Sequence, residues 1–159
     1  MEQPMLSLDR KAALELLRNL PDGEEMLLCV TGWSMLPLLF HKRSFVYLKK
    51  ENHYIPRKGD IVLFIRLDGS IVLHRVHKIE KNGLLTINGD AQNWTEQIFP
   101  QQVLATVTRY VRFKREVSVE SLGYRVYRHM WCPLRWIHPL GAKMVYFWHR
   151  IPQKMFGEK

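Results

Sequence analysis

Apolar residues recur at helical spacing near the start of the chain, at Leu8, Ala12, Leu16 and Leu20. This spacing predicts a short amphipathic helix over residues 7–20, because side chains three or four positions apart share one face of a helix. Ser7 precedes the apolar stripe and is a residue type that caps helix N-termini. The turn sequence Pro21-Asp22-Gly23 then stops the helix. We therefore expect an N-terminal helical segment over residues 1–22.

The chain next changes to short runs rich in β-branched and aromatic residues, separated by Gly, Asp and Asn. Such runs predict β-strands, here over residues 26–31, 45–49, 60–66, 70–78, 83–88 and 103–110. Asp68-Gly69 and Asn82-Gly83 each join two neighbouring runs, and both dipeptides favour tight β-hairpins. The pattern predicts a mainly β domain with antiparallel strands over residues 23–117.

Beyond residue 117 the pattern becomes helical over residues 118–131 and then irregular, with a further short helix expected over residues 141–150. This predicts a helical C-terminal extension over residues 118–159. A length of 159 residues suits one domain with a core of its own.

Most of the net charge lies in the last third of the chain. Residues 1–108 carry 13 basic and 12 acidic residues, whereas residues 109–159 carry 11 basic and 3 acidic ones. The same part contains Trp131, Trp136 and Trp148. Basic residues mixed with tryptophan suit an anionic membrane surface, where the rings lie at headgroup level. A packed helix with a solvated basic face is the alternative, and nucleic-acid binding is a less favoured third.

No segment of the sequence has the length of a membrane-spanning helix. The apolar run over residues 26–40 is shorter than the ~20 residues that a bilayer requires, and prolines and charged residues interrupt residues 130–148. The N-terminus has no basic stretch followed by an apolar one, so no secretory signal is expected. These features predict a protein on the cytoplasmic side, with peripheral membrane contact through the C-terminal extension as a hypothesis.

Metal and redox chemistry are not indicated. Cys29 and Cys132 lie far apart and fit no metal or redox spacing, so two reduced, partly buried thiols are expected, with a disulfide as the alternative. The seven histidines contain no pair at metal-ligand spacing, and no glycine loop of the phosphate-binding type is present. We therefore expect no metal and no other cofactor.

Three short motifs do carry chemistry. Residues 30–37 read Val-Thr-Gly-Trp-Ser-Met-Leu-Pro and place Ser34 two positions after Gly32. A serine nucleophile needs a turn that exposes its hydroxyl and directs backbone N–H groups at the developing oxyanion, and glycine permits such a path. A serine hydroxyl is a poor nucleophile until a base removes its proton. Leu73-His74-Arg75-Val76 offers that base, and Asn88-Gly89-Asp90-Ala91 offers a carboxylate to orient it.

These motifs resemble those of type I signal peptidases, and the resemblance covers about residues 30–107. Ser-Met-x-Pro is the nucleophile box of that family and recurs here as Ser34-Met35-Leu36-Pro37. The chain is most similar to the branch in which histidine replaces the usual lysine base. The resemblance implies an antiparallel β domain of the signal-peptidase type. It also implies a serine endopeptidase that cleaves a leader or precursor peptide through an acyl-enzyme.

The resemblance assigns roles to individual residues as well. It makes Ser34 the nucleophile and His74 the general base, and histidine needs less desolvation than lysine to act as a base near neutral pH. Strand alternation places His74 on one face with Val72 and Val76, and His77 on the other. Asp90 would orient the imidazole.

Three further residues belong to the predicted site region. Asp60 is the aspartate of a second Gly-Asp motif and is the rival of Asp90, although it fits a structural turn better. Gly32 stands where many bacterial members have a serine that helps to bind the oxyanion, so the Ser34 N–H would carry that task. Met35 would line a substrate pocket that favours small side chains. An extended substrate would add a strand beside the enzyme's own strands.

The missing anchor sets this chain apart from the family. It favours the trimming of a small peptide or precursor on the cytoplasmic side over the cleavage of secretory signals. Two other functions stay open. A self-cleaving repressor-type protein shares this fold, but it requires a lysine base and an Ala-Gly cleavage site before the serine, and neither is evident here. A non-catalytic module would keep the fold and bind a membrane or a peptide.

Overall fold

The computed structural model describes residues 10–131. This part begins with helix α1 (Arg10–Asn19) and ends with helix α2 (Leu122–Trp131). A single 3-10 turn, η1 (Pro100–Gln102), leads into the longest strand. The strands are β1 (Glu25–Cys29), β2 (Phe45–Lys49), β3 (Ile61–Ile65), β4 (Ile71–Ile79), β5 (Leu85–Asn88), β6 (Glu96–Ile98), β7 (Val103–Arg112) and β8 (Arg115–Ser118).

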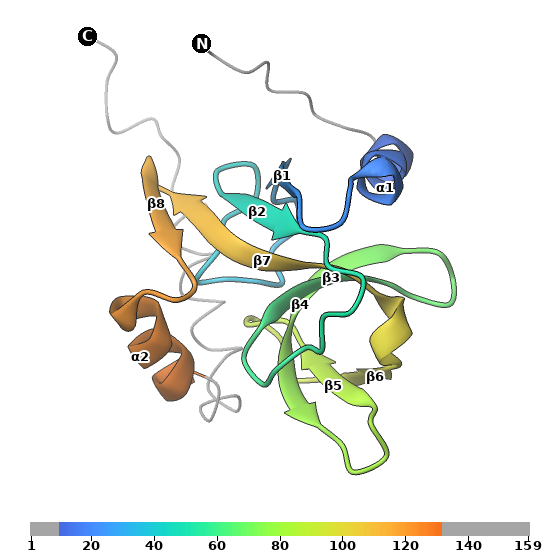
Figure 1. Cartoon of the computed structure of the whole chain (residues 1–159). Helices are drawn as coiled ribbons and strands as arrows, with labels where there is room; N and C mark the ends of the chain where they lie inside the picture. Colours follow the sequence, from blue (N-terminus) through green and yellow to red (C-terminus); the bar gives the residue numbers. More distant parts are fainter. Residues whose placement is uncertain (1–9, 132–159) are drawn as a thin grey trace, which may run out of the picture.

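All of these strands belong to one eight-stranded antiparallel sheet. Its order is β1-β2-β7-β3-β4-β5-β6, with β8 pairing with β7. Strand β7 therefore separates β2 from β3, which are neighbours in the sequence. Figure 1 shows β7 crossing the middle of the molecule, with α1 and α2 on opposite sides of the sheet region. The expected mainly β fold with antiparallel strands is confirmed.

Both hairpins expected from the sequence are present. Strands β3 and β4 pair from Ile65↔Ile71 onward, and the turn between them closes when the Ser70 N–H donates to Oδ1 of Asp68 at 2.8 Å. Strands β4 and β5 pair from Ile79↔Leu85 onward around Asn82-Gly83. The β4–β5 ladder contains an irregularity between Val76 and Lys78.

Alternation along β3 and β4 divides the interior into two clusters. Ile61 and Leu63 of β3 belong to a first cluster that we call the cleft-side core, and Val62 and Phe64 belong to a second, the histidine-side core. Strand β4 continues the division, since Ile71 and Leu73 pack on the cleft-side core and Val72 on the other. Period-two alternation is the expected behaviour of a strand with buried side chains on both faces.

Both helices add to the cleft-side core. Helix α1 buries Leu17 to 3 % exposure there, whereas Leu16 is 49 % exposed. The expected face through Leu16 is therefore wrong by one position, because tertiary packing selects which side of a short helix is buried. Helix α2 contributes Tyr124, which is 3 % exposed.

Several boundaries differ from the expected ones. The C-terminal helix begins at Leu122 rather than at residue 118, because β8 extends through Ser118. Strands β6 and β8 were not expected from the pattern. Both are short and polar, with sequences Glu-Gln-Ile and Arg-Glu-Val-Ser. Ser7 and the helix expected over residues 141–150 lie outside the described residues.

No helix within residues 10–131 combines the length and the apolar character that are needed to cross a bilayer.

Candidate active site

Ser34 lies in the turn that connects β1 to β2. Gly32 has a φ of +97°, in the left-handed region that glycine occupies without strain. The Gly32 N–H donates to Nδ1 of His41 at 2.8 Å, and Trp33 stacks on the same imidazole with ring centroids 5.2 Å apart. These contacts hold the turn from one side and leave Ser34 partly exposed.

The loop that follows β5 holds the turn from the other side. The Ala91 N–H donates to the Ser34 carbonyl oxygen at 2.8 Å. A Cβ at Gly89 would lie only 2.7 Å from the same oxygen, closer than real Cβ contacts come. Glycine is therefore required for the two loops to approach this closely. The Gly-Asp motif and the serine motif are thus brought together in space.

Ser34 and Met35 line a cleft of about 170 Å³. Its walls come from β1 through Leu28, from β4 through Ile71 and Leu73, and from α1 through Leu17. The volume is below the ~300–1,000 Å³ that is common for small-molecule sites. A cleft this small and apolar fits individual apolar side chains better than a cofactor.

His74 follows directly after the cleft-lining part of β4. Its side chain is 2 % exposed and faces the histidine-side core, where its ring contacts Phe64 at 6.1 Å and Trp94 at 6.2 Å between centroids. This is the face shared with Val72 and Val76 that strand alternation predicts. Ser34, by contrast, lines the cleft with Leu73, whose side chain packs on the other cluster.

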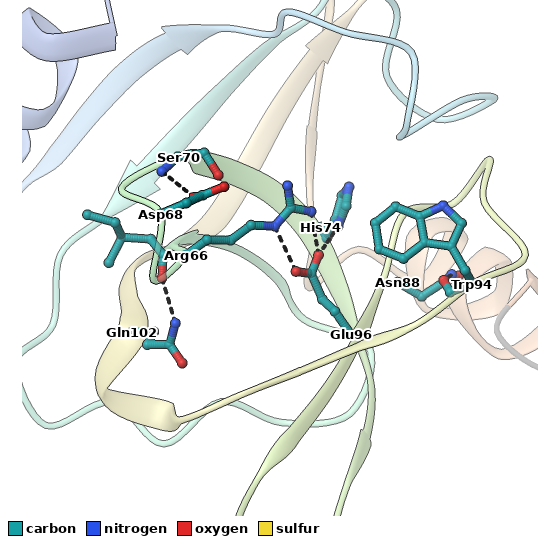
Figure 2. Close-up of polar contacts among 9 residues, drawn as sticks. Arg66, Asp68, Ser70, His74, Asn88, Trp94, Glu96 and Gln102 are labelled. Carbon is teal, nitrogen blue, oxygen red and sulfur yellow. Dashed lines mark hydrogen bonds and ion pairs between the residues drawn. The ribbon is translucent and has the colours of Figure 1, made fainter.

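Glu96 is the carboxylate that the structure brings to His74 (Figure 2). Its Oε1 lies 3.4 Å from Nδ1 of His74, although the described residues offer that nitrogen no hydrogen bond of good geometry. Arg66 binds both oxygens of the same carboxylate, through Nε and Nη2, each at 2.7 Å. Glu96 is thereby fixed between a permanent cation and the imidazole.

The sequence analysis did not find Glu96. Its strand is only three residues long and begins with two polar residues, so it lacks the alternating pattern that identifies a strand. The pairing register of β4, β5 and β6 identifies Glu96 instead. Glu96 pairs with Ile87, and Ile87 pairs with Val76, two positions after His74 on the same face. That relation is visible only when the strand order is known.

Asp90 does not contact His74 through its side chain. Its two oxygens accept hydrogen bonds from Nε and Nη2 of Arg75, at 2.7 and 2.6 Å, and both side chains are almost fully buried. The second terminal nitrogen of Arg75 donates to the Gly59 carbonyl at 3.0 Å and to the Tyr124 hydroxyl at 2.7 Å. Asp90 therefore neutralises a buried arginine, whereas Glu96 is the carboxylate that lies beside His74.

Asp60 occupies the structural turn that its sequence context indicates. Its Oδ2 accepts hydrogen bonds from the Tyr54 hydroxyl at 2.7 Å and from the Arg57 N–H at 2.6 Å. His77 lies at the irregularity between Val76 and Lys78, where the register of the β4–β5 ladder shifts. Neither residue lines the cleft that contains Ser34.

Burial governs the protonation of His74. Desolvation lowers its pKa to about 4, since the ring loses its hydration, and the charge of Arg66 lowers it further. The Glu96 carboxylate acts in the opposite direction but does not offset the burial. The imidazole is neutral at neutral pH and can accept a proton. Within residues 10–131, however, no hydrogen bond joins it to Ser34.

The low pKa of His74 predicts a stability loss on mild acidification. The unfolded chain binds a proton near pH 6.5, whereas the folded chain does so only near pH 4. The stability present above pH 6.5 is therefore lost as the pH falls toward 4, by about 3 kcal/mol. Urea unfolding at several pH values checks this, with His74→Gln as the reference. A decline of equal size in both proteins would assign the effect to other groups.

Two further kinds of functional group are metal ligands and reactive thiols. The described residues contain no cluster of three His, Cys, Asp or Glu side chains with the arrangement of a metal site. Cys29 is a free, half-buried thiol at the cleft, and burial raises its pKa. Cys132 lies outside the described residues.

No family model, no curated protein and no solved structure matches this chain. The resemblance to type I signal peptidases therefore stays a prediction that rests on the motifs.

Proposed function

We propose that the protein is a serine endopeptidase of the signal-peptidase type that cleaves a leader or precursor peptide. The position of Ser34 carries the proposal. Its partly exposed side chain stands at the wall of an apolar cleft, on a turn held by His41 and by the Ala91 N–H. A serine in a small apolar cleft suits a peptide whose neighbouring side chains enter that cleft.

Two free strand edges favour an extended peptide as the substrate. Within residues 10–131, strand β1 lies at the edge of the sheet and pairs with β2 alone. Residues 71–73 of β4 pair with β3, but the β4–β5 ladder starts only at Arg75↔Asn88. Both edges border the cleft that contains Ser34. An extended peptide could therefore add a strand there, with main-chain hydrogen bonds for affinity and the cleft for selectivity.

The proposed chemistry uses the groups at this site in sequence. His74 accepts the proton of Ser34, whose oxygen attacks the scissile carbonyl. The imidazolium then donates that proton to the amine, the C–N bond breaks, and an acyl-enzyme on Ser34 is left. The Ser34 N–H stabilises the oxyanion, since the Gly32 N–H is already bound to His41. Glu96 stabilises the imidazolium from 3.4 Å. Water that His74 activates then releases the acyl group. The mechanism requires a Ser34–His74 contact with substrate bound, and it therefore requires the His74 ring to leave its position against Phe64.

A peptide-library experiment tests this function. The purified chain is incubated with a diverse set of peptides, and new termini are identified by mass spectrometry. We expect cleavage by the wild type and by Ser70→Ala, but none by Ser34→Ala. Ser70 is the matched control because its buried hydroxyl has no hydrogen-bond partner among the described residues. Cleavage that survives Ser34→Ala would exclude Ser34 as the nucleophile.

A non-catalytic peptide-binding module is the second candidate. The separation of Ser34 from the imidazole favours it, because the His74 ring faces the histidine-side core while Ser34 lines the cleft. Such a module would bind peptides from the same library without cutting them. Ser34→Ala would then leave the affinity unchanged.

We also place the activity on the cytoplasmic side of the membrane. Fractionation of cells into cytosolic, membrane and secreted pools tests this placement, and recovery in the secreted pool alone would contradict it.

A further inference from the structure

Helix α2 has two faces with different surroundings. Its inner face carries Tyr124 and Tyr127, whose rings lie 5.7 and 6.0 Å from the guanidinium carbon of Arg75. The outer face carries three apolar side chains spaced by four residues. They are 75 %, 50 % and 64 % exposed, and they are Leu122, Val126 and Met130. We call these three residues the α2 stripe. Spacing by four places them in one row along the helix.

Basic residues lie beside the α2 stripe. Arg125 and His129 are exposed on the same helix, and Arg128 lies over Gly59 and 3.9 Å from Asp60. The sequence from residue 121 to residue 157 contains six Lys and Arg residues and no Asp or Glu. The nearby carboxylates are Glu120, exposed just before the helix, and Asp60, which pairs with Arg128. An exposed apolar row beside basic side chains is typical of a helix that lies in a membrane interface.

We propose that the outer face of α2 docks on an anionic lipid surface. The α2 stripe would enter the boundary between headgroups and acyl chains, and Arg125 would meet lipid phosphates or carboxylates. The apolar stripe and the basic side chains would thus both contact the lipid. The proposal does not depend on the peptidase function.

Other partners fit the same surface less well. Nucleic acid would use the cations through its phosphates, but it would leave the aliphatic α2 stripe without a role. A second copy of the chain could cover the α2 stripe, but it would bring the exposed Arg125 side chains of both copies near each other. Like charges at an interface oppose such pairing. Charge and apolar character together therefore select an anionic bilayer.

Docking in this way would also orient the candidate site. The Tyr124 hydroxyl accepts a hydrogen bond from Arg75, and Arg75 holds Asp90 next to the loop that contacts Ser34. The helix on the lipid surface is thus joined to the cleft through buried polar contacts. A peptide at the membrane would meet a cleft with a defined orientation.

Vesicle co-sedimentation of the full chain tests the proposal. We expect binding to phosphatidylcholine vesicles that contain phosphatidylserine and little binding to phosphatidylcholine alone. The triple variant Leu122→Gln/Val126→Gln/Met130→Gln is expected to bind about tenfold or more weakly, because the apolar insertion is lost while the charge is kept. Glutamine preserves helix propensity.

Ile55→Gln/Leu67→Gln is the matched control, because it removes two apolar side chains that are 79 % and 94 % exposed and do not belong to the α2 stripe. Circular dichroism confirms that each variant folds. Equal binding by the wild type and the triple variant would overturn the proposal and assign binding to residues 132–159. Equal binding to neutral and anionic vesicles would overturn the anionic requirement. Loss of a dimer rather than of vesicle binding in the triple variant would identify a second copy as the partner.

Discussion

Replacing His74 with glutamine is expected to lower the rate of peptide cleavage by about 10³-fold or more, with a smaller change in peptide affinity. A general base contributes about 10²–10⁴-fold, and histidine in a serine site can contribute more. The peptide binds through the cleft and the free strand edges, which His74 does not line. Glutamine keeps a polar group near Glu96 and Arg66. Measurement of kcat and KM on a peptide from the library checks both parts of the expectation.

Two other histidines provide matched controls. His41 lies at the serine turn, where its Nδ1 accepts the Gly32 N–H, and is the nearest rival base by contact. His77 is three residues after His74 and lies at the register shift of the β4–β5 ladder. We expect His41→Gln and His77→Gln to retain most of the activity. A large loss in His41→Gln, with little change in His74→Gln, would make His41 the base and contradict the assignment.

Replacing Asp90 with alanine is expected to destabilise the fold by about 3–5 kcal/mol, because it leaves the buried guanidinium of Arg75 without its counter-charge. Both side chains are at most 4 % exposed. Arg75 also donates to the neutral oxygens of Gly59 and Tyr124. A loss of this size is a large part of the ~5–15 kcal/mol that holds a typical domain together. Thermal and urea unfolding measure it.

Glu116→Ala is the control for this measurement. Glu116 and Arg109 form an ion pair at 2.6 Å, with side chains 43 % and 37 % exposed. Solvent screens such a pair, so we expect a loss below about 1 kcal/mol. The double variant Arg75→Met/Asp90→Leu should recover much of the stability that Asp90→Ala loses, because no charge stays buried. An Asp90→Ala protein that keeps its stability but loses activity would restore the role that the resemblance assigns to Asp90.

Local pattern was sufficient for most of the fold. Six strands and two hairpins follow from alternation and from turn dipeptides, because those signals depend on neighbours only a few residues apart. The motif also indicates that Gly32 permits an unusual backbone path, and its φ is +97°. Alternation also placed His74 with Val72 and Val76, on the face where its ring lies.

Local pattern did not determine which face of a helix is buried or which short polar segments form strands. Leu17 rather than Leu16 is buried, because only the sheet determines which side of α1 faces the core. Strands β6 and β8 were not found, since their short polar sequences become strands through pairing with β5 and β7. Propensity is a weak guide when a longer neighbour supplies the hydrogen bonds.

The sequence by itself determined the local conformations and the motifs that supply a serine, a histidine and a carboxylate. Only the tertiary structure decided which groups meet. Strand order and register place Glu96 beside His74, and they give Asp90 to Arg75, which stands next to His74 on the opposite face of β4. The physical reason is that adjacent residues of a strand face opposite ways. The partners of His74 and Arg75 therefore come from distant segments that pack on opposite faces of β4. No local sequence pattern specifies those segments.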